Sequence, residues 1–187
     1  GTNPELVKFF FTGVMHWVVI FAPLVAVFLF ASFMNSNPPK EMALVALAGF
    51  AALMGLSFAV IFAVYTAMSI FGAFMGAGVL FGVMSFYGYF TKRSLEGLGS
   101  FLFVGLIAIV IASIINIFIG STVMQMVISA IAIIIFLGLT AYDTQQIREE
   151  ISYDDTGRSE IVGALTLYMD FINIFVNLLQ LFGEKND

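Results

Sequence analysis

The stretch GALTLYMDFINIFVNLLQLFG, residues 163–183, is long and apolar enough to cross a lipid bilayer as an α-helix. A membrane-spanning helix needs about 20 apolar residues, and one charged side chain, Asp170, interrupts this run near its middle. A carboxylate at that depth costs about 2.5–3.5 kcal/mol on insertion scales. Charged residues retained inside membrane helices usually serve a function, so Asp170 is the first candidate site residue.

The composition of the whole chain is that of an integral membrane protein. Of its 187 residues, 61% are hydrophobic and 10% are charged, whereas about 25% are charged in an average soluble domain. The absence of cysteine excludes a disulfide framework and thiolate metal sites. The chain lacks a basic stripe for nucleic acid, and it contains no nucleophile triad, phosphate loop or zinc motif, so we expect neither an enzyme nor a resident cofactor.

Six apolar stretches are predicted to be transmembrane helices, at residues 6–33, 42–64, 67–90, 98–119, 122–146 and 161–182. The breaks between them carry helix-ending residues. The Pro-Pro pair in NSNPPK (35–40) cannot continue a helix, and Ser121 or Thr122 can cap the fifth stretch. REEISYDDTGRSE (148–160) is the most polar loop. We therefore expect one all-α transmembrane domain over residues 1–187, a bundle of six spans.

The distribution of lysine and arginine predicts the orientation of the bundle. Two basic residues, Lys8 and Lys185, fall on one side of the membrane. The other side has Lys40, Lys92, Arg93, Arg148 and Arg158. Because basic loops remain in the cytoplasm, loops 91–99 and 148–160 are predicted to be cytoplasmic and both ends of this chain to lie outside it.

Asp170 belongs to a polar stripe on the last predicted span. Thr166, Asn173 and Asn177 lie four residues before it, three after it and seven after it, so all four share one helix face. The opposite face is apolar. Such a stripe on a membrane helix must face protein or water rather than lipid.

The fifth span has a matching stripe that includes Thr140 and ends in a second carboxylate, Asp143. If Asp143 meets Asp170, the pair will share one proton, because two adjacent negative charges in a medium of low dielectric are disfavoured. The pair could then act as a pH-sensitive latch or a cation site. The alternative is that Asp170 makes a structural hydrogen bond and Asp143 is an ordinary interfacial charge. The spacing leaves both interpretations open.

Glycines of the third span follow the small-xxx-small pattern, in the pairs Gly72/Gly76 and Gly78/Gly82. This pattern allows helix backbones to approach closely. It would serve either a dimer interface or packing within the bundle, and the abundance of small residues in such bundles favours the second.

The two aspartate segments resemble a known family. GLTAYDTQQI (138–147) followed by residues 163–183 is similar to the last two helices of the transmembrane Bax inhibitor motif family, bacterial branch. YTAMSI (65–70) and SFYGYFTKRSL (85–95) resemble its middle helices. Members have seven helices, so we expect that the first is missing from this chain.

The resemblance implies a pH-sensitive calcium leak in a bacterial inner membrane, in which Asp143 and Asp170 form a proton-sensing pair and contact Ca²⁺ transiently. Calcium would be the permeant ion, with protons as the regulating ligand. Some relatives latch one aspartate with an arginine. The matching region here, NSNPPK (35–40), has no arginine. Its cation is Lys40, which is the candidate latch. Supporting polar residues would be Thr140, Thr166, Asn173 and Asn177.

Two other functions would use the same residues. A proton-coupled secondary transporter would show saturable, coupled flux and often inverted repeats, and the chain shows no such repeat. A non-conducting regulatory protein would bind a membrane partner, such as a protease or a component of cell-death control, and would show no flux when pure.

Overall fold

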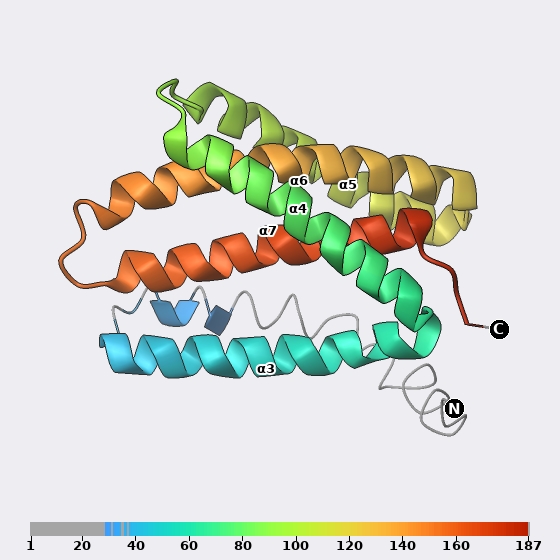
Figure 1. Ribbon diagram of the computed structural model, residues 1–187, viewed down its shortest axis with the longest axis horizontal. Coiled ribbons are helices and arrows are strands. Elements are labelled where there is room, and N and C mark those ends of the chain that lie inside the picture. Colours follow the sequence, from blue (N-terminus) through green and yellow to red (C-terminus); the bar gives the residue numbers. More distant parts are fainter. Residues whose placement is uncertain (1–28, 31, 35, 37, 187) are drawn as a thin grey trace.

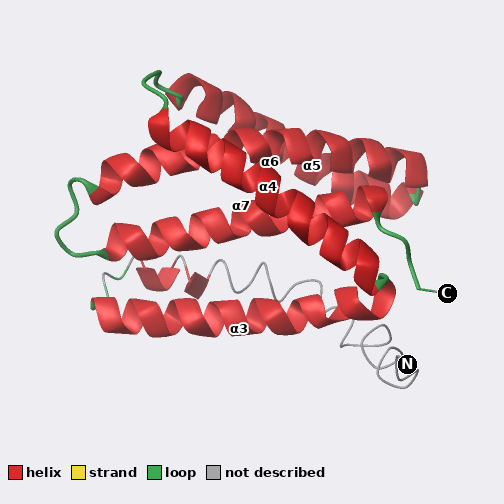
Figure 2. Cartoon of the chain, viewed as in Figure 1, coloured by secondary structure: helices red, strands yellow, loops and turns green. Residues whose placement is uncertain are grey.

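The computed structural model describes residues 29–30, 32–34, 36 and 38–186, and within them the fold is all-α (Figure 1). Five long helices follow one another: α3 (Lys40–Val64), α4 (Ala67–Phe90), α5 (Glu96–Ile119), α6 (Thr122–Ile151) and α7 (Arg158–Phe182). The described chain contains no β-strand, only an isolated bridge between Tyr65 and Lys185 (Figure 2). Most of the expected first span, 6–33, falls outside the described residues.

The helices start and end close to the expected apolar stretches, with one informative difference. α4 has the expected bounds, whereas α6 continues beyond residue 146 to Ile151. The additional residues, IREEI, include good helix formers that need not lie in lipid. Among the described helices, α4, α5, α6 and α7 are each long and apolar enough to cross a membrane.

The turns between helices are fixed by local chemistry. Thr66 Oγ1 accepts a hydrogen bond from Ser69 N at the start of α4, and Ser121 Oγ accepts one from Met124 N at the start of α6, both at 3.2 Å. Ser121 is thus the cap, one of the two residues proposed for that role. Gly120 ends α5 in the left-handed region at φ 68°, where a side chain would be strained.

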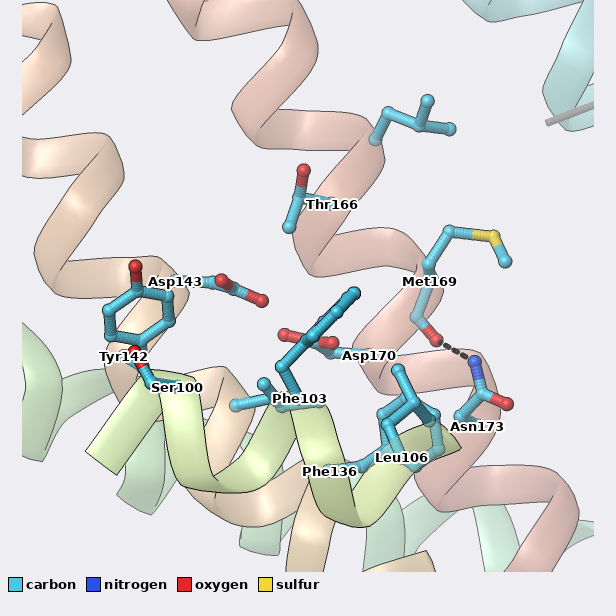
Figure 3. Close-up of a pocket in the computed structure, with 13 residues that line it drawn as sticks. Ser100, Phe103, Leu106, Phe136, Tyr142, Asp143, Thr166, Met169, Asp170 and Asn173 are labelled. Atoms are coloured by element: carbon cyan, nitrogen blue, oxygen red, sulfur yellow. Dashed lines mark hydrogen bonds between the residues drawn. The ribbon is translucent and has the colours of Figure 1, made fainter. Parts of the chain in front are cut away.

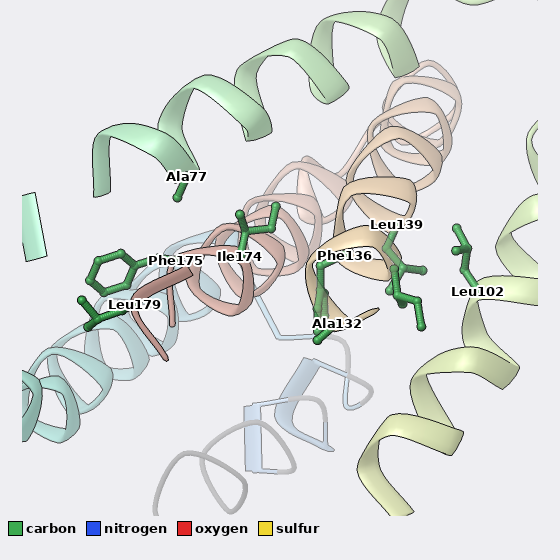
Figure 4. Packing of buried hydrophobic residues seen from close by; sticks show 9 residues of the cluster. Ala77, Leu102, Ala132, Phe136, Leu139, Ile174, Phe175 and Leu179 are labelled. Carbon is green, nitrogen blue, oxygen red and sulfur yellow. The ribbon is translucent and has the colours of Figure 1, made fainter. Parts of the chain in front are cut away.

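α6 is the central helix of the bundle. It packs against α7 along most of its length and also against α4 and α5, while α4 and α3 contact α7 (Figure 1). Ala132 and Phe136 of α6 meet Ile174 of α7, Ala77 of α4 and Leu102 of α5 in the main apolar core (Figure 4). The outer faces of the helices are also apolar; Phe118 of α5, for example, is 86% exposed. A bundle with apolar residues both inside and outside is suited to lipid.

Close packing of α4 on α6 depends on Gly88 rather than on the expected glycine pairs. A Cβ at Gly88 would overlap the carbonyl oxygen of Ala141. At Gly72, Gly78 and Gly82, by contrast, a Cβ would meet nothing within 4 Å in the described structure. Contacts among the described helices therefore do not explain the pattern at Gly72, Gly78 and Gly82, while Gly76 has an ordinary contact with Leu178.

The start of α7 is held by Asp154. Its Oδ1 accepts a hydrogen bond from Thr156 N at 2.8 Å and another from Thr156 Oγ1, and its Oδ2 accepts one from Ser159 N at 2.7 Å. The bonds from Thr156 and Ser159 hold the pKa of Asp154 well below its usual range. Asp154 thus satisfies the Ser159 amide in the first turn of α7.

Asp154→Asn should loosen this first turn in a pH-dependent way. A carboxylate whose folded-state pKa is depressed stabilises the fold above its ordinary pKa of about 3.9, and that contribution is lost as the pH falls further. We expect several-fold lower hydrogen-exchange protection of the Ser159 amide at pH 7 and a smaller difference near pH 3. Asp155→Asn is the control and should change little. Equal protection in parent and variant at pH 7 would contradict the capping role.

Candidate functional site

Asp143 and Asp170 are brought together at the interface of α6 and α7. Asp170 is 4% exposed and Asp143 is half-buried. Their carboxyl groups point toward each other (Figure 3) and are close enough to interact electrostatically. Ionised carboxylates only accept hydrogen bonds, so a hydrogen bond between the two groups would require a proton on one of them.

Asp170 has few other partners. Its Oδ2 is buried and receives no hydrogen bond from an N–H or O–H group in the described part of the chain. A buried oxygen of this kind is costly unless it is protonated, hydrated or in contact with a cation. The protonation state of Asp170 therefore depends on the Asp143 carboxyl and on what occupies the space beside the pair.

The extension of α6 explains how the two residues meet. Asp143 lies about eight residues before the end of α6, or about 12 Å along the helix, rather than at a helix terminus. A short loop then reverses the chain, and α7 runs back along α6. Asp170 lies about 18 Å from the start of α7, so the two side chains reach similar depths.

A cavity of about 690 Å³ lies beside the pair, in the angle formed by α5, α6 and α7. Its polar lining residues are Ser100, Tyr142, Asp143, Thr166, Asp170 and Asn173. Much of the remaining wall is apolar, with Phe103 and Leu106 of α5 facing Phe136 of α6 (Figure 3). A space of this size, lined in part by polar groups, can hold several water molecules or a hydrated cation.

A second, smaller cavity of about 170 Å³ lies on the loop side of Asp143. It shares Tyr142, Asp143 and Thr166 with the larger cavity and is also lined by Gln146 and Glu150. Asp143 therefore borders both cavities. Both cavities thus lie beside Asp143, between the α6–α7 loop and Asp170.

The supporting polar residues of the stripe occupy two kinds of position. Thr166 and Asn173 line the large cavity, and each donates a hydrogen bond to the carbonyl four residues earlier, at 3.0 and 2.8 Å. Thr140 is fully buried and donates to Phe136 O at 2.7 Å, while Asn177 donates to Asn173 O at 2.8 Å. Neither Thr140 nor Asn177 lines the cavity, so both stand beside the site rather than in it.

Lys40 pairs with a different carboxylate from those expected. Its Nζ lies 3.1 Å from Glu160 Oε2, which joins the start of α3 to the first turn of α7. Both side chains are about half exposed, and an ion pair of this kind contributes little to stability. In this arrangement the lysine contacts the first turn of α7 and does not contact Asp143 or Asp170.

Several site residues were not identified from the sequence. Ser100 and Tyr142 line the cavity, and a Cβ at Gly99 would lie 2.5 Å from the ring of Tyr142, so a glycine is needed where α5 approaches α6. The α5 residues lie in an apolar stretch that carries no polar stripe. Only the small pair Gly99-Ser100 could have indicated a close approach.

Gln145 links the site to the α4–α5 loop. It is buried, its Oε1 accepts a hydrogen bond from Leu95 N, and its Nε2 donates one to Arg93 O, both at 2.9 Å. These bonds fix the loop and the start of α5 against the end of α6. Nothing in the sequence TQQI distinguishes Gln145 from Gln146, which makes one bond, to Tyr142 Oη at 3.1 Å.

Gln145→Leu should lower stability by about 1–3 kcal/mol, because it leaves the Leu95 N–H and the Arg93 carbonyl without this partner. Gln146→Leu is the matched control and should cost clearly less. Thermal unfolding of both variants in the same detergent checks the prediction. Equal melting temperatures for the two variants would show that the two bonds of Gln145 contribute no more to stability than the single bond of Gln146.

The chain is similar to bacterial membrane proteins along most of its length. Residues 5–187 match the family described as inhibitor of apoptosis-promoting Bax1. The chain is 47% identical over 142 residues to inner membrane protein YbhL of Escherichia coli K12, which covers 73% of the chain and 61% of that relative. It is 38% identical over 175 residues to a protein of Rickettsia prowazekii, covering 91% of the chain and 73% of that relative.

A third relative is an uncharacterized membrane protein of Streptococcus pyogenes serotype M1, 39% identical over 167 residues, which are 88% of the chain and 72% of the relative. The chain thus spans less than two thirds of the Escherichia coli relative and somewhat more of the other two. The family match covers both aspartate helices and nearly all of the chain. The chain therefore belongs to the Bax inhibitor family and is an integral membrane protein.

Proposed function

We propose that this protein is a pH-sensitive leak for cations, with Ca²⁺ as the permeant ion, gated by the proton that Asp143 and Asp170 share. The observation that supports this proposal is the pair of facing carboxyl groups beside a 690 Å³ cavity. The role is transport rather than catalysis, and no resident cofactor takes part.

The shared proton belongs on Asp170, because the more buried carboxyl loses more hydration when it is charged. With the proton in place, Asp170 donates a hydrogen bond to Asp143 and ties α7 to α6. Loss of the proton leaves two negative charges in contact. Their repulsion favours separation of the helices or occupation of the space by a cation, and carboxylate oxygens are ligands that Ca²⁺ prefers.

Asp143 and Asp170 are the main titratable groups in the wall of the large cavity. Tyr142 is the other titratable group in the cavity wall, and Glu150 lies in the smaller cavity. α5 contributes the neutral Ser100, and α4 contributes Ser85, which accepts a hydrogen bond from Thr144 at 3.3 Å. Two cations at this end of the described bundle are engaged elsewhere: Lys40 with Glu160, and Arg148 with Tyr89 O and Glu149.

Calcium flux in proteoliposomes of the purified protein, measured across about pH 5–8, tests the proposal. Because the open state binds fewer protons, flux should rise with pH, by at most about tenfold per pH unit for each linked proton. Flux that saturates and moves protons in fixed proportion would instead identify a coupled transporter. Flux equal to that of protein-free liposomes at every pH would overturn the proposal and favour a regulatory role.

We also propose that loops 91–99 and 148–160 face the cytoplasm. Arg148 donates a hydrogen bond to Tyr89 O and Gln145 binds the α4–α5 loop, so both loops lie at one end of the bundle and their basic residues act together.

Ser94→Cys should therefore escape an impermeant thiol reagent added to intact cells, since Ser94 is exposed on the cytoplasmic loop and the parent chain has no cysteine. Thr122→Cys, exposed at the opposite end, is the control that should be labelled. Labelling of Ser94→Cys with protection of Thr122→Cys would reverse the orientation.

A further inference from the structure

A second polar cluster lies at the end of the bundle opposite the α6–α7 loop. It consists of Asn116 of α5, Gln125 and Ser129 of α6, and Gln180 of α7, and is called the amide cluster below. Asn116 is 6% exposed and Ser129 is 0% exposed, whereas Gln125 is partly buried and Gln180 is exposed. The cluster therefore joins the three helices that also enclose the cavity beside the aspartates.

Each helix is tied to the next by amide or hydroxyl groups. Gln180 Oε1 accepts hydrogen bonds from Gln125 Nε2 at 2.8 Å and from Ser129 Oγ at 3.0 Å, which joins α7 to α6. Gln125 Oε1 accepts one from Asn116 Nδ2 at 3.2 Å, which joins α6 to α5. Asn116 Oδ1 accepts one from Ser121 N at 3.2 Å, which fixes it to the α5–α6 turn.

The amide cluster lies on the same helix faces as the aspartates. On α7, Thr166, Asp170, Asn173, Asn177 and Gln180 follow one another at alternating steps of four and three. This spacing keeps all five on one face. Gln180 is about ten residues beyond Asp170, or about 15 Å farther along the helix.

α6 shows the same alignment. Ser129, Phe136 and Asp143 are seven residues apart, or about two helical turns. Ala132 and Phe136 fill the part between the two polar ends and are buried in the core. The α6–α7 interface thus has a carboxyl pair toward one end, an apolar middle and a hydrogen-bonded amide cluster at the other end.

We propose that the amide cluster closes the far end of the cation pathway, so that its hydrogen bonds between helices must break before an ion can leave. The inference rests on the proposed leak function. It adds to the aspartate pair a second closure, made of amide and hydroxyl groups that do not titrate. The side-chain oxygens released on opening are neutral ligands of the kind that Ca²⁺ accepts, so the open cluster would hold the ion weakly.

The composition of the region supports a closure rather than ordinary packing. Ser129 and Asn116 are buried and have few alternative partners, so the bonded state of the cluster is favoured. Gln180 uses one oxygen for two donors on α6, so a small displacement of α7 breaks both bonds.

The first test measures access to the interior of the pathway. Ala132→Cys places a thiol in the buried middle of α6, one turn inward from Ser129, in a chain with no other cysteine. A small cationic thiol reagent added from the amide-cluster end should label it slowly in the parent background. Labelling should be faster with Gln180→Ala, or with Gln125→Ala should the first variant fold poorly.

Asn177→Ala is the matched control, because Asn177 lies on the same face of α7 and, among the described residues, its side chain bonds to its own helix at Asn173 O. It should leave the labelling rate unchanged. The expected rise with Gln180→Ala is roughly three- to twentyfold, as for loss of one or two interhelical hydrogen bonds in a membrane. Equal labelling in parent, Gln180→Ala and Gln125→Ala would overturn the inference and leave the cluster a structural contact.

Flux measurements separate this inference from the proposed function. In proteoliposomes, Gln180→Ala should raise the Ca²⁺ flux at low pH by a similar factor and keep its dependence on pH. A parent protein without flux would refute the leak but not the closure, which the labelling decides. A conducting parent whose flux and labelling are unaffected by Gln180→Ala would refute the closure alone.

Discussion

Asp170→Asn is expected to abolish the pH dependence of Ca²⁺ flux while leaving the fold intact. Asparagine is nearly isosteric with aspartate and can still form a hydrogen bond with Asp143, but it cannot titrate. The variant would keep α6 and α7 tied together at every pH and remove the charge repulsion that opens them. Flux at pH 8 should fall toward the parent value at pH 5.

The size of this effect follows from the number of protons involved. If one shared proton controls the gate, the Ca²⁺ flux of the parent protein can change by up to about tenfold per pH unit near the midpoint of its pH profile. The flux of the variant should not depend on pH. Thr166→Val is the control, since Thr166 lines the same cavity and does not titrate. It should change the amount of flux and keep its dependence on pH.

Asp143→Asn should give the same flat profile if the pair acts as one unit, and combining both changes should add little. Proteoliposome flux from pH 5 to 8, with thermal unfolding as a check on the fold, measures all three variants. If both single variants retain the parent profile, the pair is a structural contact between helices. The alternative left open by the sequence would then be the correct one.

The sequence predicted the main features of the site because a membrane leaves little choice. A carboxylate in an apolar helix must find a partner, and its polar neighbours at helical spacing identify the face that holds it. This reasoning identified Asp170 with Thr166 and Asn173, which line the cavity. It could not show that Asp143 lies deep enough to reach Asp170, because the apolar run ends before α6 does. The polar residues up to Ile151 continue the helix outside the lipid.

Other features depend on contacts between distant segments and leave no periodic trace in one sequence. The partner of Lys40 is Glu160, 120 residues away, and the partners of Gln145 are backbone groups in another loop. The cavity wall contributed by α5 is mostly apolar and therefore looks like ordinary membrane sequence. Only the packed bundle assigns these residues to the site.

The glycines of α4 show most clearly that contacts between distant segments cannot be found from one sequence. They also lead to the second prediction with a large expected effect. The small-xxx-small pattern singles out Gly72, Gly76, Gly78 and Gly82. The closest approach of α4 and α6, however, occurs at Gly88, where a Cβ would lie 2.9 Å from both Ala141 C and Ala141 Cα and would overlap Ala141 O. Backbone atoms cannot turn aside as the end of a flexible side chain can, so one helix must move.

Gly88→Ala should therefore destabilise the protein by about 1–3 kcal/mol or more, the usual cost of inserting one carbon into a packed interior. Gly82→Ala on the same helix is the matched control. A Cβ there meets nothing within 4 Å in the described structure, and alanine favours helix over glycine by up to about 1 kcal/mol. Its stability should be unchanged or slightly raised. Thermal unfolding in one detergent compares the two variants, and equal melting temperatures would contradict the close approach.

The same substitution should also alter the gate. Ala141 lies two residues before Asp143 on α6, so a helix displaced by the new methyl group moves the carboxyl that faces Asp170. A larger distance between the two carboxyl groups weakens the hydrogen bond of the protonated pair. It also weakens the charge repulsion of the ionised pair. Gly88→Ala protein that remains folded should therefore show a shallower dependence of flux on pH than the parent, whereas Gly82→Ala should not. A destabilised variant with an unchanged pH profile would mean that the gate tolerates movement of α6, and that the position of α4 does not set the geometry of the pair.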